Sequence, residues 1–155
     1  MSVQRSKRTI IASLKTPPKA DKLTRAALRY FGGKWQIAPW VISHLPAHRV
    51  YVEPFGGAAS VLMRKPRSTI EVYNDLDEEI VGIFQQLQDP AQCSQLMRLL
   101  RRTPYARGAF EQAFEPTCDP LARAQRAIVR AYMSFHHGAL FDPKKRTFAD
   151  ARHRG

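Results

Sequence analysis

The chain is poor in three things: cysteine, long apolar runs and acidic residues. Its two cysteines, Cys93 and Cys118, stand far apart without a CxxC pair, which excludes a disulfide scaffold and a cysteine-type zinc site and suits a reducing cytosol. No apolar run approaches the roughly 18 residues of a membrane span, and Ile10 to Leu14 is too short for a signal-peptide core. We therefore expect a cytoplasmic protein without a membrane segment.

Basic residues outnumber acidic residues, and the excess of basic residues is distributed unevenly along the chain. The 155 residues include 25 Lys and Arg against 13 Asp and Glu, a net charge of +12. Residues 1–34 carry +8 and residues 98–155 carry +7, whereas residues 35–97 carry −3. A strong positive field favours a polyanion, most often nucleic acid, although a solvated basic surface gives the same count. Hydrophobic residues make up 44% of the chain, enough for a folded core.

Periodicity and turn signals predict an α/β order along the chain. We expect a flexible basic leader over residues 1–28, because its first 20 residues hold five basic residues, no acid and the Pro17-Pro18 pair. After it, the pattern predicts a helix within 35–45, strands over 49–53 and 69–73 and a helix over 61–65 between them. Four further helices are predicted over 78–88, 91–102, 104–115 and 119–135. This is the opening of a βαβ unit.

Two glycine-containing turns and two acidic strand ends carry the candidate chemistry. Glu53 ends the first strand and leads into Pro54-Phe55-Gly56-Gly57, where glycines let a backbone approach a ligand closely. A carboxylate there suits an amine or a cationic centre, and Asp75, at the end of the second strand, suits ribose hydroxyls. In Tyr30-Phe31-Gly32-Gly33-Lys34, the lysine could pair with a carboxylate and the aromatic residues could shelter a ring. S-adenosyl-L-methionine has both an amino-acid end and a ribose.

Each of these features also has a plain structural interpretation. A Gly-Gly pair most often marks only a tight turn, an aspartate after a strand is often a helix cap, and Tyr30 and Phe31 are of a type common in cores. The joint order and spacing of the three segments is what favours a ligand site.

The quoted residues resemble the D12 class of adenine-N6-specific DNA methyltransferases, the Dam-like group, and phage-type members in particular. The similarity rests on Tyr30-Phe-Gly-Gly-Lys34, Tyr51-Val-Glu-Pro-Phe-Gly-Gly-Ala-Ala-Ser60 and Asn74-Asp75. It implies a Rossmann-like methyltransferase fold, S-adenosyl-L-methionine as cofactor, and methyl transfer to N6 of adenine in double-stranded DNA, as in restriction–modification systems. The residues it points to for the cofactor are Tyr30, Lys34, Glu53, Phe55, Gly56, Gly57 and Asp75.

The resemblance also divides the chain and assigns its basic residues. Residues 29–90 would be the cofactor-binding half of the domain, and residues 91–155 the helical start of a target-recognition region. In that region Arg123, Arg126 and Arg130 lie off the apolar stripe of the last helix and are candidates for DNA contacts.

One departure from the family is serious, because its catalytic Asp-Pro-Pro-Tyr does not occur. In the family this motif holds the adenine amino group and stacks on the flipped base. Thr103-Pro104-Tyr105 and Asp142-Pro143-Lys144 are the nearest strings, and neither has the chemistry. We expect an amino-terminal fragment with an incomplete sheet, inactive alone and completed by a missing carboxy-terminal half.

The alternatives are a non-catalytic DNA-binding or cofactor-binding remnant, and a methyltransferase for RNA or protein. His136-His137 has no partner at ligand spacing, so no metal site is predicted.

Overall fold

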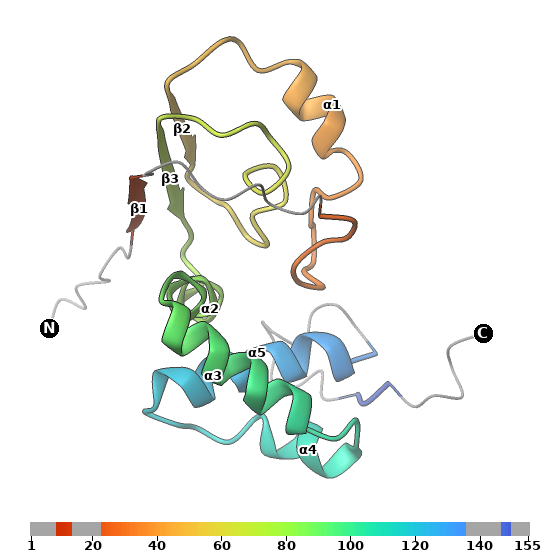
Figure 1. Ribbon diagram of the computed structural model, residues 1–155. Helices are drawn as coiled ribbons and strands as arrows, with labels where there is room; N and C mark the ends of the chain where they lie inside the picture. Colours follow the sequence, from red (N-terminus) through yellow and green to blue (C-terminus); the bar gives the residue numbers. More distant parts are fainter. Residues whose placement is uncertain (1–8, 14–22, 136–146, 150–155) are drawn as a thin grey trace, which may run out of the picture. The chain divides into compact units, whose positions relative to one another are not determined.

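The computed structural model describes residues 9–13, 23–135 and 147–149, and it divides the chain into two compact units (Figure 1). The first unit holds residues 1–27 and 32–78, and the second holds residues 28–31 and 79–155. Within the described residues, no helix is long and apolar enough to cross a membrane.

The first unit is built on a three-stranded sheet with the order β1-β3-β2. Strand β2 (Val50–Glu53) pairs in parallel with β3 (Ile70–Asn74), and Glu53 is opposite Tyr73. Both strands fall where the sequence predicts them, because their β-branched and aromatic residues favour an extended backbone. A parallel pair accompanied by helices fits an incomplete α/β fold.

Strand β1 corrects the prediction for the leader. Thr9–Ser13 forms a strand that pairs antiparallel with β3, from Thr9 opposite Asn74 to Ser13 opposite Ile70. Residues 1–28 were expected to be flexible throughout. A five-residue strand among basic residues gives a weak local signal, and its pairing partner lies about sixty residues away along the chain.

The connection between β2 and β3 also differs from the prediction, since turns replace the expected helix over 61–65. Isolated helical hydrogen bonds form there, from Met63 N to Ala59 O (2.9 Å) and from Lys65 N to Val61 O (2.9 Å). Ala59 has a positive φ of 52°, which is outside the helical region and prevents a regular helix from starting at the glycine turn.

A buried ion pair fastens this connection to β3. Lys65 Nζ lies 2.6 Å from Glu71 Oε1, and both side chains are almost completely buried. Ser68 accepts from Lys65 Nζ (2.8 Å), and the Lys65 ammonium also lies over the Tyr51 ring at 4.5 Å. A charge buried this deeply is tolerated because its polar partners replace water.

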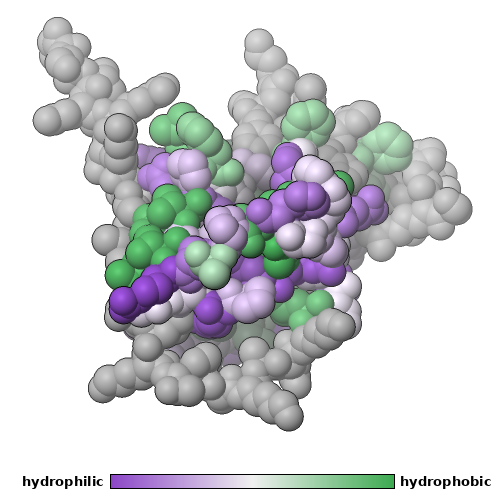
Figure 2. Space-filling model, turned by 90° about the horizontal axis from the view of Figure 1, so that it is seen from above, coloured by the Kyte–Doolittle hydropathy of each residue, from purple (hydrophilic) through white to green (hydrophobic). Residues whose placement is uncertain are grey.

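The first unit also contains a short helix, α1 (Ala38–Ser43), within the predicted range 35–45. It begins with Pro39 in its first turn, where the missing N–H costs nothing, and Ala38 is fully buried. On the face shown in Figure 2, hydrophobic residues lie among hydrophilic ones in separate groups. Exposed side chains such as Trp40 contribute to the apolar surface of this unit.

The second unit is helical, as the sequence predicts. Its helices are α2 (Glu78–Gln88), α3 (Pro90–Arg102), α4 (Arg107–Gln112) and α5 (Pro120–Met133). Asp89 and Asp119 cap α3 and α5, and each accepts hydrogen bonds from two backbone N–H groups of the following turn.

The core of this unit forms where α3, α4 and α5 meet. Phe110, Ala113, Val129 and Met133 are buried together there, and Phe114 contacts Phe110 edge to face at 5.0 Å. Phe148 packs against the same cluster, in a segment joined to the end of α5 by a hydrogen bond from Ala149 N to Met133 O (2.8 Å). Helix α5 contributes Val129 and Met133 to this core, whereas Tyr132 and Phe135, which the sequence placed on the apolar stripe of 119–135, are exposed.

Candidate functional site

The glycine loop after β2 is bound to the end of β3. Four hydrogen bonds join the two segments: Gly56 N to Asn74 O (2.9 Å), Gly57 N to Asp75 Oδ2 (2.7 Å), Tyr73 Oη to Gly57 O (2.6 Å), and Asn74 Nδ2 to Pro54 O (2.8 Å). Parallel pairing brings the carboxyl ends of β2 and β3 to the same edge of the sheet. Two sequence segments that were expected to share a site therefore meet.

The geometry excludes a side chain at Gly56 and favours glycine at position 57. A Cβ atom on Gly56 would lie 2.2 Å from Cε2 of Tyr73, a buried ring that is fixed by its own hydrogen bond. Gly57 has a φ of 50°, where glycine is favoured. The sequence identified the glycines, but it gave no reason to assign Tyr73 a part in holding the loop. The alternation along β3, which buries Glu71 and Tyr73 on one face, is the signal for it.

Glu53, the acid at the end of β2, has one engaged and one unengaged oxygen. Oε1 accepts from Tyr51 Oη (2.8 Å) and from Leu62 N (2.8 Å). Oε2 is buried and has no hydrogen-bond partner among the described residues. Burial raises the pKa of the Glu53 carboxyl above its usual range, although the hydrogen bonds from Tyr51 and Leu62 act in the opposite direction. A buried carboxylate oxygen without a donor suits an amine or hydroxyl of a ligand.

Asp75 is held at both of its oxygens by backbone groups. Oδ2 accepts from Gly57 N (2.7 Å), and Oδ1 accepts from Asp77 N (2.9 Å). A carboxylate oxygen has two acceptor positions, so each oxygen retains one for a further donor. Asp75 is half-buried, and its orientation is fixed before any ligand arrives.

The remaining predicted cofactor residues are less closely tied to this edge. Phe55 is 79% exposed, and Lys34 is exposed with its ammonium donating to the carbonyl of Gly32. Tyr30 is half-buried and belongs to the second unit, so its predicted part in the cofactor site stays a prediction.

One contact that the sequence did not suggest connects the Lys34 segment to the loop region. Arg64 donates from Nη1 to Trp35 O (2.6 Å), and its guanidinium lies 4.6 Å from the centre of the Trp35 ring. Arg64 belongs to the turns that follow the glycine loop. Within the first unit, this hydrogen bond ties the residue that follows Lys34 to the turns that follow the glycine loop.

The three arginines proposed to meet DNA have different environments. Arg130 is buried, forms an ion pair with Glu79 and donates to Ala113 O, so the prediction that it lies on a solvated or phosphate-facing surface is wrong. Its guanidinium instead ties α2 and the end of α4 to α5. Arg123 and Arg126 are half-buried, and Arg126 donates from Nη1 to Glu115 O (2.5 Å) and Pro116 O (3.2 Å).

Of the strings nearest to the catalytic motif, only one lies in the described part of the chain. Tyr105 donates to Ala149 O (2.9 Å), and its ring lies 5.4 Å from that of Phe148, which is a packing role. Asp142-Pro143 and His136-His137 lie outside the described residues.

Comparison with known proteins identifies the family. Residues 30–141 match the sequence model of the D12 class N6 adenine-specific DNA methyltransferases. No curated protein and no solved structure gives a match. The matched region covers more than half of the chain and includes the glycine loop, Asp75 and the helices of the second unit. The chain therefore belongs to the family of D12 class N6 adenine-specific DNA methyltransferases.

Proposed function

We propose that this chain is the cofactor-binding part of an adenine-N6 DNA methyltransferase and binds S-adenosyl-L-methionine where the glycine loop meets the end of β3. The observation that carries the proposal is the hydrogen bond from Gly57 N to Asp75 Oδ2, because it fixes the loop and the acid in one small region. A loop and carboxylate held in place before binding lose little conformational entropy when a ligand arrives.

The residues at this edge fit the two polar ends of the cofactor. The buried, unengaged Oε2 of Glu53 is suited to accept from the amino group of the methionine part. Asp75 has acceptor positions for ribose hydroxyls, and the exposed ring of Phe55 offers an apolar face. Lys34 completes the proposed set within the first unit, and Tyr30 is assigned to the cofactor by the resemblance alone. When bound, the cofactor supplies a methyl group activated by a sulfonium centre.

A Rossmann-like sheet is part of the same proposal. In the described residues β2 lies at an edge, and Val50 and Val52 are each 52% exposed there. Apolar residues on an edge strand favour pairing with a further strand. We infer that the sheet is completed by a segment that also carries the catalytic motif, joined to this chain or separate from it.

Calorimetry with S-adenosyl-L-methionine tests the cofactor site. Asp75→Asn keeps an oxygen for Gly57 N, puts an amide nitrogen in place of the oxygen that accepts from Asp77 N, and removes the charge that ribose hydroxyls would meet, so we expect binding to weaken by about 1–3 kcal/mol. Asp89→Asn is the matched control, because Asp89 caps α3 and asparagine caps equally well. Unchanged affinity in Asp75→Asn would remove Asp75 from the site, and a wild-type chain that is folded but does not bind would refute the proposal.

The alternative is a basic DNA-binding protein without catalysis, and the net charge of +12 favours it. Phosphate-driven binding weakens steeply with salt and has little sequence preference. DNA binding with that salt dependence, in a chain that does not bind the cofactor, would support the alternative.

A further inference from the structure

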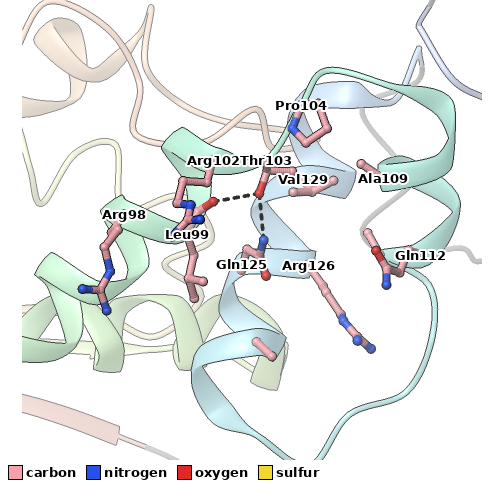
Figure 3. A pocket seen from close by; sticks show the side chains of 12 residues that line it. Arg98, Leu99, Arg102, Thr103, Pro104, Ala109, Gln112, Gln125, Arg126 and Val129 are labelled. Atoms are coloured by element: carbon pink, nitrogen blue, oxygen red, sulfur yellow. Dashed lines mark hydrogen bonds between the residues drawn. The ribbon is translucent and has the colours of Figure 1, made fainter.

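The second unit contains a cavity that the cofactor proposal does not use. It has a volume of about 600 Å³ and lies between α3, α4 and α5 (Figure 3). Three arginines line it, namely Arg98, Arg102 and Arg126, and none of the described residues that line it is acidic. Positive charge without a compensating carboxylate favours an anionic ligand.

Two of these arginines are available to a ligand. Arg98 and Arg102 lie one helical turn apart on α3 and are exposed, and their guanidinium groups form no hydrogen bond or ion pair with the described residues. Arg126 is held from the opposite side by the carbonyls of Glu115 and Pro116 through Nη1 alone. Guanidinium groups bind phosphate oxygens through charge-assisted hydrogen bonds.

The rest of the lining is suited to a ring rather than to a second charge. Leu99, Pro104, Val129 and three alanines provide apolar surface. Figure 3 shows Thr103 between α3 and α5, where it donates to Leu99 O (2.8 Å) and accepts from Gln125 Nε2 (2.8 Å). The side-chain amide of Gln112 on α4 forms no hydrogen bond with the described residues, so it can serve a ligand.

The cavity is too large for a phosphate alone and falls in the usual range for small-molecule sites, roughly 300–1,000 Å³. We propose that it binds one nucleotide unit, with the phosphate on Arg98 and Arg102 and the sugar or base against the apolar wall. The unit comes from an unstacked strand of nucleic acid or from a free mononucleotide. The proposal does not depend on cofactor binding in the first unit.

Two variants test the pocket by different means. Arg98→Gln/Arg102→Gln removes two charges from the lining, and Arg25→Gln/Arg101→Gln removes two charges from exposed positions outside it. Ala122→Leu fills part of the cavity without changing charge. The probe is a fluorescein-labelled single-stranded oligonucleotide followed by anisotropy, with thymidine 5′-monophosphate and inorganic phosphate as competitors. Circular dichroism checks that each variant is folded.

We expect the pocket double variant and Ala122→Leu each to weaken oligonucleotide and thymidine monophosphate binding roughly tenfold or more relative to the control pair. Binding of the mononucleotide without the oligonucleotide supports the site and identifies the free nucleotide as its source. Equal losses in the two double variants, no effect of Ala122→Leu, or phosphate competing as well as the mononucleotide would overturn the proposal. We expect Asp75→Asn to leave oligonucleotide and mononucleotide binding to the pocket unchanged. A failure of the pocket proposal can therefore be told apart from a failure of the cofactor proposal.

Discussion

Gly56 illustrates how one side chain can be excluded by its neighbour. In Gly56→Ala the new methyl group would meet the ring of Tyr73 at 2.2 Å, and the ring cannot withdraw without losing its hydrogen bond to Gly57 O. We expect the free energy of unfolding to fall by about 1–3 kcal/mol, measured by urea denaturation. Gly82→Ala is the control, because a methyl group there meets nothing within 4 Å and removing a helical glycine stabilises by about 0.5–1 kcal/mol. A Gly56→Ala protein as stable as the wild type would contradict the close approach.

The raised pKa of Glu53 leads us to expect that the free energy of unfolding depends on pH. Because burial raises the pKa of Glu53, the folded chain holds its proton to a higher pH than the unfolded chain does. The stability of the wild type therefore falls as the pH rises from the unfolded value, about 4.3, through the raised folded value. Glu53→Gln lacks this titration, so its free energy of unfolding relative to the wild type should increase over that window. Urea denaturation at several pH values measures the difference. A difference that is constant with pH would show that the carboxyl has no raised pKa.

At the scale of helices and strands, the sequence predicts what is decided locally. The β-branched strands, and the helices that begin after Asp89 and Asp119, lie close to their predicted ranges because their signals are contained in a few neighbouring residues. Strand β1 depends on a distant partner, and the missing helix over 61–65 depends on the positive φ of Ala59. Neither can be read from local periodicity. The same holds for Arg130, whose burial follows from its distant partner Glu79.

The cap of α5 gives a prediction at this scale. Asp119 accepts from Leu121 N (3.1 Å) and Ala122 N (3.2 Å), and α5 brings Val129 and Met133 into the core. Asp119→Ala leaves those N–H groups without the side-chain acceptor and should lower the free energy of unfolding by about 1 kcal/mol. Asp119→Asn keeps an acceptor and should cost only a few tenths of that. Equal stability of the two variants in urea would show that the cap does not contribute.

For the whole molecule, the order of the motifs was enough to predict the family, whereas the grouping of contacts was not predictable. The resemblance to the family placed a boundary near residue 90. The contacts group α2 with the later helices, and the ion pair of Glu79 with Arg130 is one physical reason. The sequence also predicted that Glu53, the glycines and Asp75 lie near one another. In the structure they lie at the same edge of the sheet, where β2 and β3 end. It could not reveal that Asp75 is already held by Gly57 and Asp77, since backbone donors leave no mark in the sequence.

In this family the cofactor-binding residues and the catalytic motif lie in separate segments, and this separation predicts the behaviour of the purified chain. The 155 residues hold the glycine loop and the carboxylate that we propose bind the cofactor, but no Asp-Pro-Pro-Tyr to hold the adenine amino group and stack on the base. With labelled S-adenosyl-L-methionine and an adenine-containing duplex, we expect cofactor binding without methyl incorporation. Adding a polypeptide that carries the motif should start incorporation, and the same polypeptide with its motif Asp replaced by Ala should not. Incorporation by the purified chain alone would mean that another group performs the transfer, and the proposed dependence on a second segment would be wrong.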